Sequence, residues 1–273
     1  MPKINNYQYP DSLVQAYELL GNPKSRIVAG GCSLIQQKTG DYDTLIDITG
    51  LPFKYIKEEN SQIKIGATVS FNELATSPLL LEIAGGIVGQ AALSAASAHL
   101  RNQMTIGGNL VQPLWWCSLP PVFLALEAKV KLYAGQEKEI SLEELYQKLP
   151  LKGEILTEII FDKPSASCKG KFVKFSLTSQ DLAILNLAVL LEGDRRNPTK
   201  VRLALGSAVP TPVRLKQTET FLQGKNLSSE ILDNAVKIAQ QEVKPLDEIR
   251  AGAKYRLELI KTLLKRTLAE LAE

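Results

Sequence analysis

The spacing of apolar positions predicts a small parallel unit at the start of the chain. Apolar residues recur at helical spacing over 13–20, directly after the capping residue Ser12. Short apolar runs at 26–29 and 44–48 predict two strands with a polar helical stretch between them. Strand, helix and strand at this spacing indicate a βαβ unit that ends near residue 55.

Two capping boxes mark the starts of helices in the next segment. Ser70 and Glu73 form the first, ahead of an apolar helix that is expected to end at the glycine pair 85–86. Ser141 and Glu144 form the second, ahead of a short helix. Both boxes predict helix starts from local sequence alone.

The rest of this segment alternates between strands and helices. Residues 55–65 predict a hairpin around a polar turn, and 89–102 predict a helix of small residues that leads into a loop at 105–109. Residues 122–134 predict a buried helix that passes into a strand, and 155–161 predict a final strand. The segment has no internal repeat.

Three strands and two helices are predicted in the last segment. The strands lie at 172–177, 182–193 and 200–208, although the middle run also suits a helix. Amphipathic helices follow around 231–239 and 257–271. The whole pattern predicts an α+β protein of three small domains. Their expected limits are 1–55, 56–163 and 164–273.

Composition and charge remove several classes of protein. Apolar residues make up 45% and charged residues 22% of 273, which excludes a disordered chain or a coiled-coil rod as the main state. The net charge of +3 comes without a basic run, so we expect no nucleic-acid partner. Because no apolar run is long enough for a signal segment or a bilayer span, a cytoplasmic protein without a membrane span is expected.

Cysteine and histidine usage points away from catalysis by the chain's own residues. Cys32, Cys117 and Cys168 lie far apart and form no C-x-x-C pair, which argues against a disulfide framework or a metal centre. His99 is the only histidine, so a histidine-based triad or a two-histidine metal site is discarded unless His99 acts with one carboxylate. Otherwise we expect His99 to be a partly buried polar residue on the helix before the second glycine loop. No catalytic residue and no metal ligand is therefore predicted, as in a protein whose chemistry belongs to a bound cofactor.

Two glycine pairs are the candidate binding elements. They lie in AGGCSL at 29–34 and in TIGGN at 105–109. Glycine allows positive φ and close approach, so successive amides of such a loop can converge on a pyrophosphate. Alternatively, each pair only makes a tight turn. Neither loop is G-x-G-x-x-G, and a P-loop is absent, so Rossmann and P-loop sites are not supported.

Five motifs together resemble those of one protein family. They are AGGCSL, SAASAHLRNQMTIGGNL, LPPVFLALEAKV, LALGSAVPTPVR and AGAKYRLELIKTLL, in this order. From about residue 4 to 270 the chain is similar to the FAD-binding (medium) subunit of the molybdenum hydroxylases, the xanthine dehydrogenase and carbon monoxide dehydrogenase family. The resemblance implies a small parallel α/β unit, an antiparallel α/β unit and a C-terminal domain of three antiparallel strands with a helical bundle. It also implies that FAD lies between the first two parts.

The resemblance implies non-covalent FAD and assigns its contacts residue by residue. The first pyrophosphate loop corresponds to Val28, Ala29, Gly30, Gly31, Cys32, Ser33 and Leu34. The second FAD loop corresponds to Thr105, Ile106, Gly107, Gly108 and Asn109. The remaining expected contacts are Ser118, Ile159, which would pack on the isoalloxazine, and Lys174, which would lie near the flavin ring.

The implied function is electron transfer within an oxidoreductase complex. In such assemblies a large subunit carries molybdopterin and a small subunit carries [2Fe–2S] clusters. The FAD subunit takes electrons from the clusters and passes them to NAD or another acceptor. Two alternatives stay open: a stand-alone FAD-dependent reductase or oxidase of the same fold, and a non-catalytic scaffold subunit with weakened FAD binding.

Some positions depart from the family pattern. Ser118 stands where many members have an aspartate that contacts FAD, so we expect weakened rather than abolished binding. Trp115, Trp116 and Cys117 suit either core packing or a contact with the flavin or a partner. Cys32, inside the first loop, is either a bystander thiol or a redox-sensitive one with a lowered pKa.

Overall fold

The computed structural model describes residues 3–34, 40–112 and 116–273. The chain divides into two compact units, each made of several stretches. The first unit comprises Met1–Glu73, Ser97–Pro113 and Ala128–Asp162. The second comprises Leu74–Ala96, Leu114–Glu127 and Lys163–Glu273.

A three-stranded parallel sheet begins the first unit. Strands β1 (Asn6–Gln8), β3 (Thr44–Asp47) and β2 (Ser25–Val28) lie in that order, and helix α1 (Leu13–Leu20) packs on β2 and β3. The Oγ of Ser12 accepts a hydrogen bond from the Gln15 amide, so Ser12 caps α1 as predicted. Sequence reasoning missed β1 because its three residues are polar and exposed. The helix predicted between β2 and β3 lies partly outside the described residues, and its described part is turn and irregular chain.

A five-stranded antiparallel sheet forms the rest of this unit. Its order is β4 (Ile56–Glu59), β5 (Gln62–Gly66), β8 (Ile155–Asp162), β6 (Lys129–Tyr133) and β7 (Glu137–Ser141). The predicted hairpin corresponds to β4 and β5. Helix α8 (Leu142–Lys148) follows the second capping box, in which the Oγ of Ser141 accepts a hydrogen bond from the Glu144 amide. Strands β6 and β8 match those expected from apolar runs, whereas β7 was missed because its residues are mostly charged and exposed.

The helices between residues 71 and 111 are shorter than predicted. The expected helix ending at 85–86 is wrong: the chain forms α2 (Phe71–Thr76), α3 (Pro78–Glu82) and a 3₁₀ turn, because Pro78 interrupts the backbone hydrogen bonds. The expected helix over 89–102 divides into α4 (Ile87–Leu93) and α5 (Ala98–Gln103), with Ala96 at φ 44° between them. The loop expected at 105–109 is instead the start of helix α6 (Ile106–Val111).

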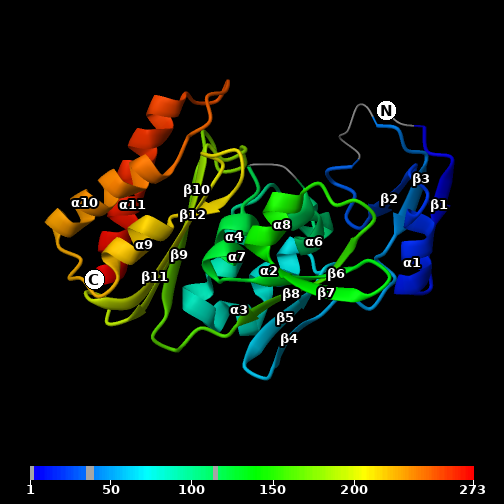
Figure 1. Cartoon of the computed structure of the whole chain (residues 1–273), viewed down its shortest axis with the longest axis horizontal. Coiled ribbons are helices and arrows are strands. Elements are labelled where there is room, and N and C mark those ends of the chain that lie inside the picture. The colour runs from blue at the N-terminus through cyan, green and yellow to red at the C-terminus, as the bar shows by residue number, and fades with distance from the viewer. Residues whose placement is uncertain (1–2, 35–39, 113–115) are drawn as a thin grey trace. The chain divides into compact units, whose positions relative to one another are not determined.

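The second unit is built on an antiparallel sheet covered on both faces. Its order is β12 (Val213–Arg214), β11 (Pro198–Gly206), β10 (Leu185–Gly193) and β9 (Lys169–Phe175). One face carries α9 (Lys216–Leu222), α10 (Ser229–Glu242) and α11 (Ala253–Ala272), and the other carries α4 and α7 (Leu119–Ala125) (Figure 1). Because both faces of β10 are covered, its run of buried residues is continuous, and this apolar run made the strand look like a helix.

The fold class predicted from the sequence is confirmed: one parallel sheet, two antiparallel sheets and a helical C-terminal region. In the described part of the chain, no helix combines the length and the apolar character that crossing a membrane requires.

Candidate functional site

The first glycine loop leaves strand β2 with its amides unused. Val28, the last residue of β2, is buried, and Gly31 takes φ 69°, a conformation that favours glycine. Within the described residues, the amides of residues 29–34 donate no hydrogen bond. Successive free amides next to a residue of positive φ form a concave surface that suits an anion such as a pyrophosphate.

This loop lies against the segment that leads into the second glycine motif. A Cβ on Gly30 would stand 1.7 Å from the carbonyl oxygen of Gln103, so only glycine fits there. The Oγ of Ser33 donates to the Oε1 of Gln112 at 3.1 Å, and the Sγ of Cys32 lies 3.9 Å from the Oε1 of Gln103. The structure therefore places the first loop against Gln103 and Gln112, which flank the second motif in the first unit.

The second motif presents its amides to the protein instead. The amide of Ile106 donates to the Val69 carbonyl at 2.9 Å, and that of Gly107 donates to the Ala67 carbonyl at 2.9 Å. The Oγ1 of Thr105, at the N-cap of α6, accepts from Gly108 at 3.3 Å, and the Asn109 amide donates to the Thr105 carbonyl. The amides of residues 106–109 therefore have partners within the protein, and an FAD contact of this motif stays a prediction.

The glycine at 107 is required for packing. A Cβ there would stand 2.8 Å from the carbonyl oxygen of Ala67 and 2.9 Å from its Cβ. At Gly108 the nearest atom would be the Oγ1 of Thr105, at 3.0 Å. Gly107 thus lets the start of α6 approach the chain that follows β5.

Two buried polar atoms in this region lack partners. Within the residues that the structure covers, neither the Oδ1 of Asn109 nor the Oγ1 of Thr68 has a hydrogen-bond partner, although both residues are buried. Unsatisfied buried polar atoms are rare in native proteins and call for a ligand or a water. Together with the free amides of residues 29–34, they fit a polar cofactor such as FAD. Sequence reasoning missed Thr68, because it belongs to none of the quoted motifs. Thr68 precedes Val69, whose carbonyl oxygen accepts a hydrogen bond from the Ile106 amide.

Ile159 lies in the centre of strand β8, where its side chain is fully buried. Its neighbours in the sheet are Ile65 of β5 and Val130 of β6. The structure thus shows Ile159 as a core residue of the five-stranded sheet. Its contact with the isoalloxazine stays a prediction.

Two predicted contacts belong to the second unit. Ser118 holds the N-cap position of α7, and among the described residues its buried Oγ has no hydrogen-bond partner. The Nζ of Lys174, on β9, donates to the carbonyl oxygens of Ser94 at 2.8 Å and Ser179 at 3.1 Å. Burial lowers the pKa of Lys174, and the charge of Asp181 opposes this shift.

The described titratable side chains form no metal-binding group. No group of three histidine, cysteine or acidic side chains is placed to hold a metal ion in this part of the chain. His99 is exposed on α5 rather than partly buried as expected from its position. Burial raises the pKa of the Cys32 thiol, which contradicts the alternative of a redox-sensitive cysteine with a lowered pKa.

Of the tryptophan pair, Trp116 lies within the described residues. Trp115 lies outside the described residues, while the guanidinium of Arg250 lies 5.4 Å from the centre of the Trp116 ring. Cys117 is buried. Trp116 therefore contacts a cation of the same unit.

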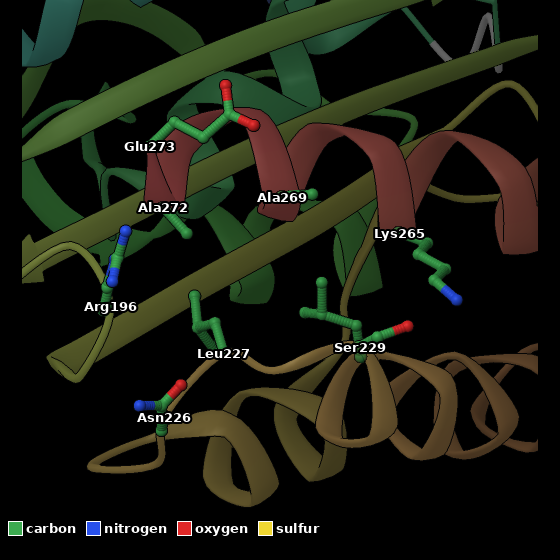
Figure 2. Close-up of a pocket in the computed structure, with 9 residues that line it drawn as sticks. Arg196, Asn226, Leu227, Ser229, Lys265, Ala269, Ala272 and Glu273 are labelled. Atoms are coloured by element: carbon green, nitrogen blue, oxygen red, sulfur yellow. The ribbon is translucent and has the colours of Figure 1, made fainter.

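A cavity of about 330 Å³ lies elsewhere in the second unit, between α10, α11 and the turn that joins β10 to β11 (Figure 2). Leu227, Leu232, Ala269 and Ala272 form its apolar lining, and Arg196 lies at one end. None of the predicted FAD contacts lines it. The cavity is thus separate from the candidate site.

Comparison with known proteins supports the resemblance seen in the sequence. Residues 2–164 match the family model described as the FAD binding domain in molybdopterin dehydrogenase. Residues 171–271 match the model described as the CO dehydrogenase flavoprotein C-terminal domain. The two matches cover both glycine motifs and the last three strands and helices.

Individual relatives match over nearly their whole length. The chain is 30% identical to the 6-hydroxypseudooxynicotine dehydrogenase complex subunit alpha of Paenarthrobacter nicotinovorans, over 98% of this chain and 95% of that one. It is 26% identical to the carbon monoxide dehydrogenase medium chain of Hydrogenophaga pseudoflava, over 98% and 97%. A solved structure of the Hydrogenophaga pseudoflava carbon monoxide dehydrogenase, lacking the Mo-pyranopterin moiety of its cofactor, matches with a TM-score of 0.91 and 26% identity, over 97% of this chain and 96% of that one.

Proposed function

The chain belongs to the family of FAD-binding subunits of molybdopterin dehydrogenases, and we propose that it is the electron-transfer subunit of a molybdenum hydroxylase complex. In this role it takes electrons from [2Fe–2S] clusters of a partner subunit and passes them to NAD or another acceptor. Bound FAD supplies the redox chemistry, because a flavin exchanges electrons singly or as a hydride.

The near full-length match to a medium chain and to a subunit of a dehydrogenase complex carries this proposal. On this reading, molybdopterin and the iron–sulfur clusters come from partner chains, a large and a small subunit. Substrate choice then lies in those chains.

The chain's own residues bind and orient the cofactor. The free amides of residues 29–34 are suited to hold the negative charge of the pyrophosphate, because partial positive charges of several N–H groups add at one point. Asn109 and Thr68 supply buried hydrogen-bonding atoms of the first unit. The FAD contacts that the resemblance implies at Ser118 and Lys174 stay predictions. The division 1–55, 56–163 and 164–273 remains our proposal for the three domains.

The test is to purify the tagged chain from the cells that produce it. We expect about one FAD per chain by chromatography after heat release, with molybdenum, iron and two further chains in the same fractions. FAD without molybdenum or iron would instead support a stand-alone flavoenzyme. A colourless chain that does not take up added FAD would support a scaffold subunit. A Gly30→Val chain, which cannot form the first loop, is the matched control for FAD content.

A further inference from the structure

The cavity of the second unit has apolar walls. Leu227 and Leu232 line it from the buried core, and Ala269 and Ala272 of α11 complete its apolar part. Because the side chain of alanine is a single methyl group, this part of α11 leaves space that larger residues would fill. The volume of about 330 Å³ lies within the range of about 300–1,000 Å³ that is typical of small-molecule sites.

The turn that carries Arg196 to one end of this cavity is fixed by its backbone. The Oδ1 of Asp194 accepts hydrogen bonds from the amides of Arg196 at 2.8 Å and Asn197 at 3.0 Å. The carbonyl oxygen of Arg196 accepts from the amide of Leu227 at 2.8 Å, so the turn is attached to the segment that lines the cavity. The backbone at Arg196 is therefore held in place before any ligand arrives.

The guanidinium of Arg196 is the cation of the cavity lining that the protein leaves unused. Among the described residues it has no hydrogen-bond or ion-pair partner, whereas Lys265, also in the lining, is paired with Asp233. The carboxylate of Glu273 points away from Arg196 (Figure 2). A guanidinium with free donors beside an apolar cavity suits a carboxylate, which it can bind through two parallel hydrogen bonds.

The length of the cavity limits the size of such a ligand. Lys265 and Ala272 both line it and lie two helical turns apart on α11, about 10 Å along the helix axis. An extended hydrocarbon chain of medium length covers this distance. A shorter acid would leave much of the apolar wall exposed to water.

We propose that this cavity binds a medium-chain monocarboxylic acid, with the carboxylate on Arg196 and the hydrocarbon chain along Leu227, Leu232 and Ala269. The site goes beyond the proposed function, because none of the predicted FAD contacts lines the cavity. It lies within the second unit alone.

The test is a calorimetric titration of the full-length chain with octanoate, below the concentration at which octanoate forms micelles. We expect saturable binding of one octanoate per chain. Butyrate has the same charge on a shorter chain, and octylamine has the opposite charge on a chain of the same length. Both should bind at least about 10-fold more weakly. A chain that binds no octanoate, or that binds octylamine equally well, would overturn the proposal.

Arg196→Gln tests the contact with the carboxylate. It should raise the octanoate dissociation constant about 10-fold or more, because a charge-assisted hydrogen bond is lost. Arg195→Gln is the matched control, since Arg195 is the neighbouring exposed arginine and does not line the cavity. Its dissociation constant should stay within about 2-fold of that of the unchanged chain. Equal losses in the two variants would show a general effect of positive charge and contradict the site.

Ala269→Leu tests the cavity itself. The larger side chain should fill the space and abolish octanoate binding, while the melting temperature stays the same or rises. Ala272→Leu, on the same face of α11, serves where Ala269→Leu does not fold. Unchanged octanoate binding in a folded variant would place the ligand elsewhere and overturn the proposal. The proposed function would stand in each of these cases, because it depends on FAD and not on this cavity.

Discussion

The two glycine motifs of the first unit look alike in sequence but differ in their use of the backbone. In 29–34 the amides have no partner among the described residues and Gly31 has φ 69°, a geometry that suits an anion. In 105–109 every amide from Ile106 to Asn109 donates to the protein, and the motif starts a helix. A glycine pair by itself therefore does not distinguish a binding loop from a packing element.

The close-packed glycines of the two motifs also lie against different segments. Gly30 and Gly107 have no room for a Cβ, because carbonyl oxygens of other segments occupy that space. The Gly30 contact brings the first motif against Gln103, just before the second motif. The Gly107 contact brings α6 against Ala67, just after β5. In the second motif the Oδ1 of Asn109 has no partner among the described residues, so we expect this side chain rather than the amides to contact a cofactor.

The largest effect is expected for Gly30→Ala. The new Cβ would overlap the carbonyl oxygen of Gln103, so the loop must move away from α5. We expect a destabilisation of about 3 kcal/mol or more together with loss of FAD, measured by thermal unfolding and by the flavin content. Gly50→Ala, where a Cβ would meet nothing within 4 Å, is the control and should change neither. Retention of full FAD by Gly30→Ala would contradict the close packing of the two motifs.

Gly107→Ala should mainly affect stability. Its Cβ would press on the carbonyl oxygen of Ala67, which costs about 1–3 kcal/mol for an overpacked site. Gly108→Ala, with only the Thr105 hydroxyl nearby, should cost less. Chemical denaturation gives both free energies of unfolding, and FAD titration of the folded protein gives the affinity. Equal stability losses in the two variants would show that 107 is not a packing glycine.

Asn109→Ala should weaken FAD without weakening the fold. In the described structure the Oδ1 of Asn109 has no partner, so its removal costs the apoprotein little. With FAD present we expect about a 3- to 10-fold higher dissociation constant. Thr105→Ala should instead lower the free energy of unfolding by about 1 kcal/mol, because it removes the N-cap of α6. If Asn109→Ala instead destabilises the apoprotein and leaves FAD affinity intact, Asn109 is a structural residue.

The smallest effect is expected at Cys32. Burial raises the pKa of its thiol, so the reactive thiolate forms only at higher pH than for a free cysteine. Alkylation by iodoacetamide should be slow at pH 7 and speed up through pH 9, and bound FAD should slow it further. Cys117 and Cys168 are buried and should not react. Cys32→Ser should leave the FAD affinity within about 2-fold. Fast alkylation at pH 7 would contradict the raised pKa.

Local sequence predicted the elements whose hydrogen bonds are local. Ser70 and Glu73 form both hydrogen bonds of the first capping box, because the partners lie three residues apart. At the second box the Ser141 Oγ accepts from the Glu144 amide, while the Glu144 carboxylate bonds Lys148. Strands β9, β10 and β11 were recognised from apolar runs, and burial on both faces explains why β10 also suited a helix. The two-residue strand β12 was missed. The helix over 89–102 failed because nothing local marks the turn at Ala96.

The sequence by itself determined the fold class, the family and the two segments that meet beside the candidate cofactor site. Only the tertiary structure decided which amides are free. Whether the amides of 106 and 107 are available depends on the carbonyls of Val69 and Ala67, residues remote in sequence that the sheet brings alongside. Every backbone amide needs a partner, and a distant partner is set by packing rather than by the residues on either side.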